Sequence, residues 1–427
     1  MASDSEAHHT NMERTQKNRI ARDNLKSVLS LRIQPITFRE TAHLLFPETY
    51  PWPRPDEGNR KIGFGQCGLV YAVQNEPGVV VKVARPHFHD SLHADHVAHE
   101  RVSKAFSARE RTSESHCISR FYKDRGAIHV KLPRVLRLEF NDSATMAERS
   151  VRQKAQLKLH EPKVKLRLVA ASSPGKPKMM ANALYTSHIP PLSKHVRDAL
   201  VELYCPVEKR DSVHADPANI DCLVRVYLGR RRRIGAPAPP NFALRNYNLH
   251  LDQMVDLGLP VVRLAAAMGE ALADMHWGAN VDAFDVEFVL GGPAPDPDSA
   301  PSRSGVRVAD LWLLDFNLCS VFDVEKVHEN GKLSELVDHL VYAYFANDPY
   351  YPRPTQDDGS GGRVGVVNVD LLVWNAFKKE YLGRSREIFR SQSDATWSRY
   401  EYLPAAFLDG CMEKQRGLPP GMDKITD

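Results

Sequence analysis

Ile62-Gly63-Phe64-Gly65-Gln66-Cys67-Gly68-Leu69-Val70-Tyr71 is the stretch that decides the fold. Its glycines follow the pattern G-x-G-x-x-G, which is typical of backbone that passes close over phosphate oxygens, where a Cβ would clash. The same pattern occurs in Rossmann folds, but there a helix begins at the third glycine. Here Leu69 to Val73 is an apolar run that continues as a strand. The stretch therefore predicts a β-hairpin that covers a phosphate site.

A lysine lies inside the next predicted strand, Val79-Val80-Val81-Lys82-Val83. Burying the Lys82 ammonium on such a strand is costly unless it meets an anion. Glu100 lies on a helix predicted for residues 91–106 and is the expected partner. The order of the glycines, Lys82 and Glu100 resembles the lysine–glutamate pair of protein kinases. The alternative is an edge position that leaves the ammonium in water.

The run from Met275 to Leu290 resembles the catalytic loop of protein kinases and the strand after it. In that register Asp282 takes the place of the catalytic aspartate and Glu287 that of the metal-binding asparagine. The run Leu313-Leu314-Asp315-Phe316-Asn317 takes the place of the Asp-Phe-Gly motif, and a Pro/Ser/Gly-rich loop at 291–305 lengthens the separation. Asp315 would then stand where kinases hold Mg²⁺ on the phosphates.

Four carboxylates are the predicted catalytic residues: Asp282, Asp285, Glu287 and Asp315. Gathered in one cleft, they could bind a metal ion, hold a cationic substrate such as a guanidinium through paired hydrogen bonds, or act as an acid or base where crowding raises a pKa. Asp285 could instead cap a turn at the surface. The predicted cofactor-binding residues are Gly63, Gly65, Gly68, Lys82 and Glu100.

The predicted fold class is α+β, a protein-kinase-like two-lobed fold with a small β-rich N-lobe, a larger and mainly helical C-lobe, and a basic insertion. Residues 1–30 form a polar N-terminal segment whose first dozen residues are expected to be disordered. The N-lobe is expected at 31–190 and the C-lobe at 191–427. Residues 184–192 are interpreted as the hinge strand and turn between the lobes. Apolar residues at helical spacing predict an amphipathic helix from Val261 to Met275.

Two basic clusters are candidates for a phosphate-contacting surface. Residues 149–178 hold nine Lys and Arg against a single acidic residue, and Arg230 to Arg233 form a second cluster. Either could contact the backbone of a nucleic acid. For residues 163–168, where cations and apolar groups alternate, a solvated edge strand is an equal alternative. The net charge of +4 does not by itself imply a polyanionic partner.

Composition predicts a globular protein of the cytoplasm. The 427 residues are 42% hydrophobic and 26% charged, no apolar run is long enough to span a membrane, and no signal peptide is evident at the N-terminus. Six cysteines without a C-x-x-C pair argue against a disulfide framework. Five histidines between His87 and His99 raise the possibility of zinc, but no cysteine lies nearby, and a solvent-facing set is the expectation.

Several blocks of the sequence, between about residue 60 and about residue 410, resemble a fungal protein family of unknown function that carries a zinc-finger label. The blocks are the glycine segment from Ile62, 244–247, 275–277, 282–291, 311–319 and 347–354. No finger spacing supports the label. Some members of this family are arginine-containing cyclodipeptide synthases of secondary-metabolite biosynthesis. These enzymes condense arginyl-tRNA with a second aminoacyl-tRNA and release a cyclo(Arg-Xaa) diketopiperazine.

The resemblance implies that this chain is such a synthase, with aminoacyl-tRNAs as partners at the two basic clusters and with neither DNA nor a membrane as a partner. No cofactor is required, because an aminoacyl ester is already activated. The Asp282, Asp285 and Glu287 group could hold an arginyl guanidinium or accept the α-ammonium proton. Cys67 and Cys319 are acyl-accepting candidates by position only, since buried cysteines are commonly inert.

A kinase-like phosphotransferase that uses ATP and Mg²⁺ is the alternative, and a pseudokinase that only binds is a third possibility. The presence of Lys82, Glu100, Asp282 and Asp315 favours phosphoryl transfer. Departures from the kinase pattern at Asn280–Val281, Glu287 and Asn317 count against it.

Overall fold

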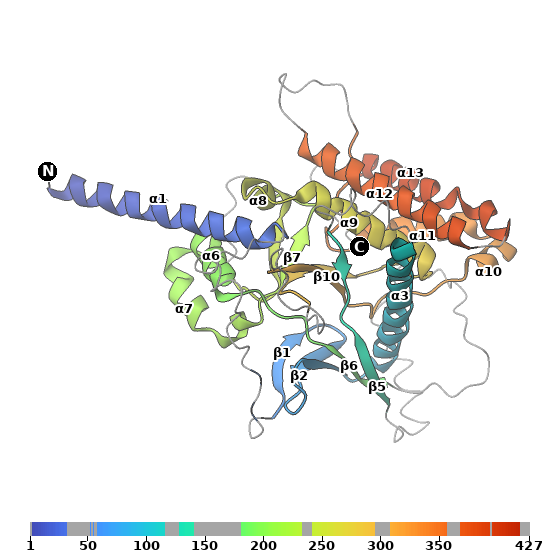
Figure 1. Ribbon diagram of the computed structural model, residues 1–427, viewed down its shortest axis with the longest axis horizontal. Coiled ribbons are helices and arrows are strands. Elements are labelled where there is room, and N and C mark those ends of the chain that lie inside the picture. The colour runs from blue at the N-terminus through green and yellow to red at the C-terminus, as the bar shows by residue number, and fades with distance from the viewer. Residues whose placement is uncertain are drawn as a thin grey trace.

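The computed structural model describes residues 2–31, 52, 54, 58–115, 128–140, 181–232, 241–294, 308–356, 368–392 and 395–418. The basic stretch 149–178, Arg233 and most of the loop 291–305 lie outside these ranges, as do parts of the predicted N-lobe. The described chain is a mixed α/β structure built on two five-stranded sheets (Figure 1).

The first sheet is antiparallel throughout, in the order β1-β2-β3-β6-β5. Its strands are β1 (Arg60–Phe64), β2 (Gly68–Ala72), β3 (Val79–Ala84), β5 (Val135–Phe140) and β6 (Ala181–Ser187). The predicted hairpin is confirmed, since β1 pairs with β2 and the N–H of Gly65 donates to the carbonyl of Gly68 over 2.9 Å. A Cβ on Gly68 would lie 2.8 Å from the carbonyl oxygen of Val83, so this position requires glycine.

The second sheet is mixed, in the order β4-β10-β9-β7-β8. Its strands are β4 (Val130–Lys131), β7 (Val224–Tyr227), β8 (Tyr247–His250), β9 (Glu287–Gly291) and β10 (Asp310–Leu314). The antiparallel pair β9–β10 places the strand expected at the end of the Met275–Leu290 run beside the apolar strand that precedes Asp315. Both strands are almost wholly buried, which explains why they are apolar rather than alternating.

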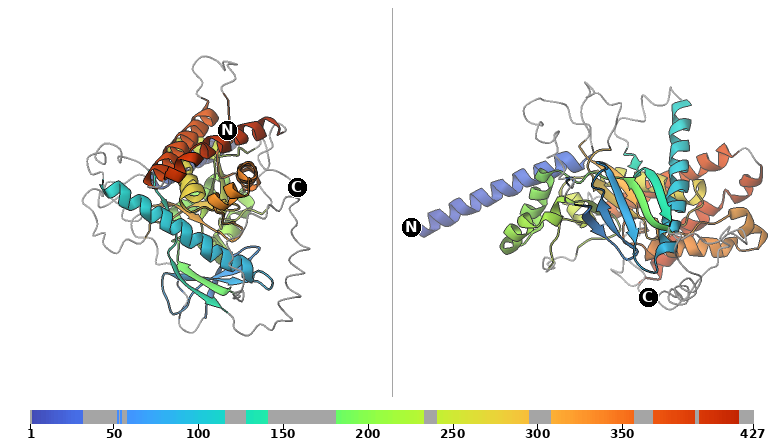
Figure 2. Two further views of the ribbon diagram at one scale, coloured as in Figure 1. Left: turned by 90° about the vertical axis from the view of Figure 1, so that its right-hand side faces the viewer. Right: turned by 90° about the horizontal axis from the view of Figure 1, so that it is seen from below.

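A long helix, α3 (His89–Ser115), follows β3 and connects the first sheet to the helical part of the molecule. It packs on β5 and β6, and it also contacts a π-helical turn at Asp274–Gly278. Figure 2 shows α3 running between the first sheet and the helices near the C-terminus. The helix predicted for residues 91–106 is therefore confirmed, with a greater length.

The helical part is built from two packed pairs of long helices. In one pair α9 (Val261–Ala273) lies along α12 (Val369–Ser391), and in the other α11 (Leu333–Ala346) lies along α13 (Leu403–Arg416). A Cβ on Gly269 would lie 2.4 Å from the carbonyl oxygen of Phe377, so glycine permits the close approach of α9 to α12. The shorter helices are α6 (Lys194–Tyr204), α7 (Arg210–Ala215), α8 (Leu251–Asp256) and α10 (Val324–Glu329).

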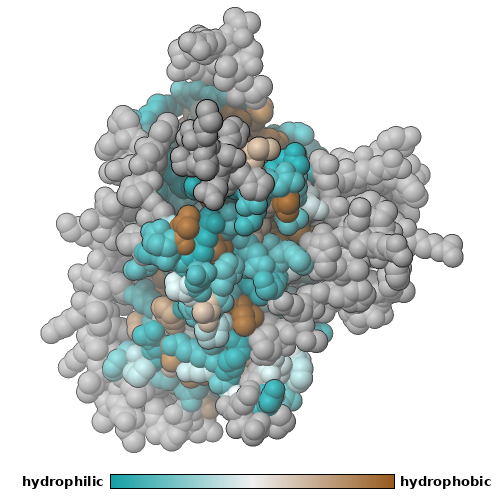
Figure 3. Space-filling view, turned by 90° about the vertical axis from the view of Figure 1, so that its left-hand side faces the viewer, coloured by the Kyte–Doolittle hydropathy of each residue, from teal (hydrophilic) through white to brown (hydrophobic). Residues whose placement is uncertain are grey.

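The N-terminal segment forms a helix, α1 (Ala2–Leu29), which also includes most of the first dozen residues, for which disorder is expected. The sequence of α1 contains no glycine or proline to interrupt a helix. Near its C-terminal end, Leu25 and Val28 are buried, and α1 packs on α6. The rest of α1 projects from the molecule (Figure 1), and the face that carries α1, α6 and α7 is largely hydrophilic (Figure 3).

The apolar core is divided unevenly between the two sheets. One large cluster runs through the helices and the second sheet, whereas the cluster under the first sheet is centred on Leu92 and Leu184 alone. A third small cluster, around Val289 and Trp312, lies on the second sheet. No helix in the described ranges is both long and apolar enough to cross a membrane.

A buried histidine on the π-helical turn predicts a pH-dependent stability. His276 is 1% exposed, its Nδ1 hydrogen-bonds the hydroxyl of Tyr381 over 3.0 Å, and burial lowers its pKa to about 3. The unfolded state therefore binds the proton more tightly, so the contribution of His276 is complete above about pH 6.5 and is lost as the pH falls toward 3.

We expect the stability advantage of the native chain over a His276→Gln variant to shrink by about 1.4 kcal/mol per pH unit below pH 6.5. Urea unfolding of both chains at pH 7, 6 and 5 measures this difference. A difference that is constant over that range would contradict a neutral, buried His276.

Candidate functional site

The candidate site is a cavity of about 230 Å³ between the two sheets, called here the central cleft. It is lined by the glycine hairpin, β3, α3, β6 and the segment after β10, and by residues near β7, β8 and β9. Gly63, Gly65, Gly68 and Lys82 all lie on its wall, as the sequence predicts. A larger and more open groove of about 580 Å³ lies between α1 and α6. We regard the central cleft as the site, because it gathers buried charges of both signs.

Lys82 is held by two carboxylates. Its Nζ lies 2.7 Å from Oδ2 of Asp95 on α3 and 2.5 Å from Oδ1 of Asp315 after β10. Burial alone would lower the pKa of Lys82, but the charges of Asp315 and Asp95 outweigh it and raise the pKa above its usual value. Lys82 is therefore a fixed cation, and the alternative of an edge lysine in water is wrong.

The predicted partner Glu100 is not part of the site. Its carboxylate lies 3.8 Å from Nζ of Lys104 on the outside of α3, and its side chain is 48% exposed. Glu100 lies five positions after Asp95, which turns its side chain about 140° around the helix from that of Asp95. Asp95 faces the cleft instead, and it is 3% exposed.

Asp95 also fixes the backbone of the segment after β10. Its Oδ1 accepts a hydrogen bond from the N–H of Phe316 over 3.2 Å. The neighbouring Asp315 has a φ of 66°, in the left-handed region that residues other than glycine rarely adopt. Such strain is typical of functional sites, where surrounding contacts must hold it.

We expect Lys82→Met to lower the free energy of unfolding by about 1–3 kcal/mol, because it leaves the Asp95 carboxylate without its counter-ion. Urea unfolding followed by circular dichroism measures the loss. Adding Asp95→Asn to the variant removes the unpaired charge and should restore part of the stability. A double variant no more stable than Lys82→Met would contradict this pairing.

Glu287 begins β9 and forms an ion pair with Arg225 on β7. Arg225 also lies 3.3 Å from Asp348, which accepts a hydrogen bond from the hydroxyl of Tyr227 over 2.9 Å. Burial raises the pKa of Glu287, Arg225 opposes the rise, and the charge of Asp315 adds to it. Glu287 therefore stands on the cleft wall as a carboxylate whose affinity for a proton is greater than usual.

Two polar atoms on the cleft wall have no hydrogen-bond partner. Asn317 is 8% exposed, and its Oδ1 is buried without a donor; the Nε of Arg225 is buried without an acceptor. Leaving such groups unpaired costs about 1–3 kcal/mol each. A ligand that donates a hydrogen bond to Oδ1 of Asn317 would remove the cost of that unpaired acceptor.

Two of the four predicted carboxylates do not reach the cleft. Asp282 is 1% exposed; its Oδ1 accepts from the N–H of Ser320 over 2.8 Å, and its Oδ2 lies 2.8 Å from Nε2 of His339 on α11. Asp285 donates its backbone N–H to Oδ1 of Asn347, a fully buried side chain. Neither carboxylate lines the cavity.

The reason is a tightly folded loop. Asn280, Ala283 and Asp285 all have positive φ values, 53°, 55° and 61°, in the left-handed region that residues other than glycine rarely adopt. Asn347 also donates from Nδ2 to the carbonyl of Ala283 over 2.9 Å, which holds this conformation in place. The prediction that four carboxylates share one cleft is therefore wrong. Glu287 and Asp315 share it, together with Asp95.

The two cysteine candidates are poor nucleophiles. Burial raises the pKa of Cys67 to about 11, and it raises that of Cys319 well above its usual value. The Sγ of Cys319 donates to the carbonyl of Phe284 over 3.4 Å. A thiol reacts as its thiolate, so neither group suits attack on an ester at neutral pH.

The histidines of α3 do not form a metal site in the structure. His99 is buried, its Nε2 hydrogen-bonds the carbonyl of Pro133 over 2.8 Å, and burial lowers its pKa. Among the described residues, no group of three or more His, Cys, Asp or Glu side chains could hold a metal ion.

The second basic cluster is partly neutralised. Arg231 pairs with Asp370 over 2.8 Å, and Arg232 pairs with Asp252 over 2.9 Å. All four side chains in these pairs are at least partly exposed, so water screens the pairs and the arginines remain accessible.

Sequence reasoning missed three residues of the site: Asp95, Arg225 and Asn317. Asp95 has a detectable signal, because it is an acidic residue early in the helix after the lysine strand. Arg225 has a weaker one, since it is a cation inside the apolar run Val224–Tyr227. For Asn317 only the place in the Asp-Phe-Asn block pointed to the cleft.

Comparison with known proteins gives one partial match. A family model named DUF3669 and described as a zinc finger protein matches residues 311–393, from β10 to the end of α12. This stretch includes Asp315 and Asn317 but not the glycine hairpin. It contains one cysteine and two histidines, fewer than the four ligands of a structural zinc site. Neither the curated proteins nor the solved structures give any match.

Proposed function

We propose that this chain is an arginine-containing cyclodipeptide synthase on a divergent kinase-like, two-lobed fold. It would condense arginyl-tRNA with a second aminoacyl-tRNA in the cytoplasm. Three features of the fold support the kinase-like part: the antiparallel order β1-β2-β3-β6-β5, a long helix directly after β3, and a glycine hairpin on the cleft wall. The pairing of Lys82 with Asp315 adds to them.

The main support for the proposal is the wall of the central cleft, which is rich in hydrogen-bond acceptors. Glu287, Asp315 and the unpartnered Oδ1 of Asn317 all line it. Around them, the three carboxylates Asp95, Asp315 and Glu287 outnumber the two cations that pair with them, Lys82 and Arg225, and Arg225 is also shared with Asp348. A single cationic group with several N–H donors fits this surplus. A guanidinium has five such donors, and an α-ammonium has three.

The chemistry needs a base rather than an activating cofactor. The α-ammonium of one aminoacyl ester loses a proton, and its nitrogen attacks the ester carbonyl of the other. The ester C–O bond breaks and the terminal tRNA oxygen leaves as a hydroxyl. The free amino group of the resulting dipeptide then attacks the remaining ester carbonyl. This step closes the six-membered ring and releases the second tRNA, again with its terminal oxygen as a hydroxyl. Glu287 is the proposed base, because burial raises its pKa toward the pH at which the reaction takes place.

Expression of the chain alone in a bacterial host tests the proposal. Mass spectrometry of the culture should reveal a cyclo(Arg-Xaa) product that is absent from a host with the empty vector. Feeding isotopically labelled arginine should shift the mass of that product by one arginine. A host that expresses folded protein and makes no arginine-containing diketopiperazine would count against the synthase.

A phosphotransferase is the second candidate, and the Lys82–Asp315 pair beneath a glycine hairpin favours it. The position of Asp282 opposes it, because this carboxylate is buried against His339 and does not line the cleft. Turnover of ATP by the purified chain would support this candidate over the synthase.

A further inference from the structure

A cluster of two cations and one exposed ring lies at the mouth of the central cleft. This mouth cluster consists of Lys61, Phe64 and Arg245. Phe64 ends β1 and is 57% exposed. The Cζ of Arg245 lies 4.6 Å from the centre of its ring, and the Nζ of Lys61 lies 5.3 Å from it. Both Phe64 and Arg245 line the cleft.

The charge of the mouth cluster is not compensated. Among the described residues, neither Lys61 nor Arg245 takes part in an ion pair. Asp221, an acidic residue of the cleft wall, is already held by both terminal guanidinium nitrogens of Arg60, each over 2.9 Å. Two cations beside an exposed ring therefore face solvent at the entrance.

The cavity behind the cluster is small. Its volume of about 230 Å³ lies below the roughly 300–1,000 Å³ of sites that enclose a whole small-molecule ligand. A Cβ built on Gly65, at the tip of the hairpin, would meet no atom within 4 Å, so the space over the hairpin is open. The geometry suits a ligand with a short group inside the cleft and a larger, anionic part outside it.

We infer that the mouth cluster binds the unpaired 3′-terminal nucleotide of an RNA. The base stacks on the Phe64–Arg245 pair, as single-stranded bases stack on aromatic rings and guanidinium planes, and the terminal phosphate meets Lys61 and Arg245. This inference rests on the proposed function, because the aminoacyl group of a charged tRNA is esterified to that nucleotide. With the base at the mouth, the aminoacyl group enters the cleft toward Asp315 and Glu287.

Binding of uncharged RNA tests the inference without any chemistry. The probe is a fluorescent RNA hairpin with four unpaired nucleotides at its 3′ end, compared by anisotropy with the same hairpin lacking them. We expect the native chain to prefer the hairpin with the unpaired end. Phe64→Ala should weaken its binding about 5- to 150-fold, the range measured for the loss of one stacked base, while Phe64→Trp should retain it.

Phe140→Ala is the matched control. Phe140 is also an exposed phenylalanine of the first sheet, at 36%, but it lies on β5 and does not line the cleft. Its replacement should leave RNA binding unchanged. Equal affinity for both hairpins, or equal binding by the native and Phe64→Ala chains, would overturn the inference.

Free ATP is the other source of a purine nucleotide, and a separate titration distinguishes it. Binding of ATP that depends on Phe64, without any preference for the unpaired RNA end, would also overturn the inference. Failure of this inference and failure of the proposed function give different results. If the chain prefers the unpaired end through Phe64 but makes no cyclodipeptide, the nucleotide site is supported and the synthase is contradicted. If the chain makes the product and Phe64 has no role in binding RNA, the synthase is supported and the nucleotide site is contradicted.

Discussion

Glu287→Gln is expected to reduce the rate of cyclo(Arg-Xaa) formation about 10²- to 10⁴-fold, the usual contribution of a positioned general base. The amide keeps the size of the side chain and can still accept a hydrogen bond from Arg225, but it cannot take up a proton at neutral pH. The loss should appear in the rate at saturating aminoacyl-tRNA, because the variant removes the proton acceptor. Weaker binding of the cationic group should accompany it, because Glu287 also supplies negative charge to the cleft wall.

Glu100→Gln is the matched control for this variant. It makes the same chemical change at a half-exposed position of α3, where the carboxylate meets only Lys104. Its rate should equal that of the native chain. Circular dichroism of both variants shows whether they are folded, and a folded Glu287→Gln chain with the native rate would exclude Glu287 as the base.

The pH profile gives an independent signature of the same group. Because burial raises the pKa of Glu287 to about 7, the ionised base becomes more abundant as the pH rises through that value. The rate of the native chain should therefore climb between pH 6 and 8. The residual rate of Glu287→Gln should not rise over this pH range. A rise that persists in the variant would assign the titration to another group.

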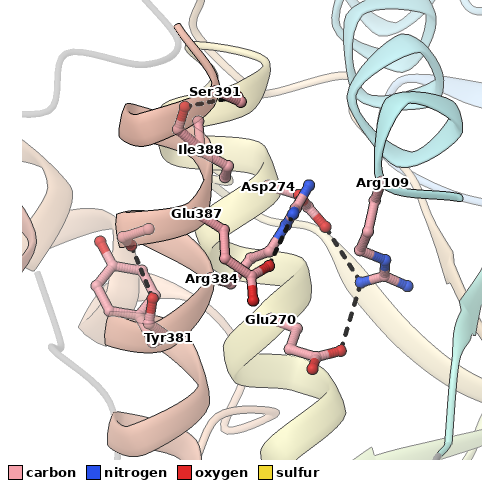
Figure 4. Close-up of polar contacts among 9 residues, drawn as sticks. Arg109, Glu270, Asp274, Tyr381, Arg384, Glu387, Ile388 and Ser391 are labelled. Atoms are coloured by element: carbon pink, nitrogen blue, oxygen red, sulfur yellow. Dashed lines mark hydrogen bonds and ion pairs between the residues drawn. The ribbon is translucent and has the colours of Figure 1, made fainter. Parts of the chain in front are cut away.

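Asp274→Ala is expected to lower the free energy of unfolding by about 3–5 kcal/mol, the usual cost of removing one partner from a buried ion pair. Asp274 is fully buried at the start of the π-helical turn. Its Oδ1 lies 2.7 Å from Nε of Arg384 on α12, and its Oδ2 lies 3.1 Å from a guanidinium nitrogen of Arg109 on α3. Figure 4 shows the carboxylate between the two arginines.

Removing Asp274 leaves both arginines without their shared buried anion. Arg109 retains a contact of 3.5 Å with Glu270, and Arg384 retains one of 3.1 Å with Glu387. Glu387 is 65% exposed, so Glu387→Gln, which breaks only a solvated pair, should cost less than about 1 kcal/mol. Urea unfolding of the two variants compares these costs. Similar losses for both would contradict a central role for Asp274.

The strands and the glycine hairpin follow from local sequence. Val79 to Val81 are β-branched, and Gly68 permits the close approach of β2 to β3. These preferences depend on a few neighbouring residues, so the strands and the hairpin can be predicted without knowledge of the rest of the chain. The same holds for the apolar runs of β9 and β10, which are buried on both faces.

The partners of the charged side chains depend on tertiary structure and were harder to predict. Whether Asp95 or Glu100 meets Lys82 is decided by the rotation of α3, which its packing on the first sheet sets. Asp282 turns away from the cleft because His339 offers it a partner from α11. The order of the motifs predicts a catalytic role for Asp282, but it does not show that His339 on α11 lies beside this carboxylate.

The most direct test of the central claim uses the purified chain, arginyl-tRNA charged with labelled arginine, and a mixture of other aminoacyl-tRNAs, with no ATP present. Mass spectrometry and radiochromatography follow the arginine. We expect the native chain and Glu100→Gln to release a labelled cyclo(Arg-Xaa), and Glu287→Gln to lose at least about 10²-fold in rate. Arginine that stays on its tRNA, or leaves only as the free amino acid, would contradict the proposed function.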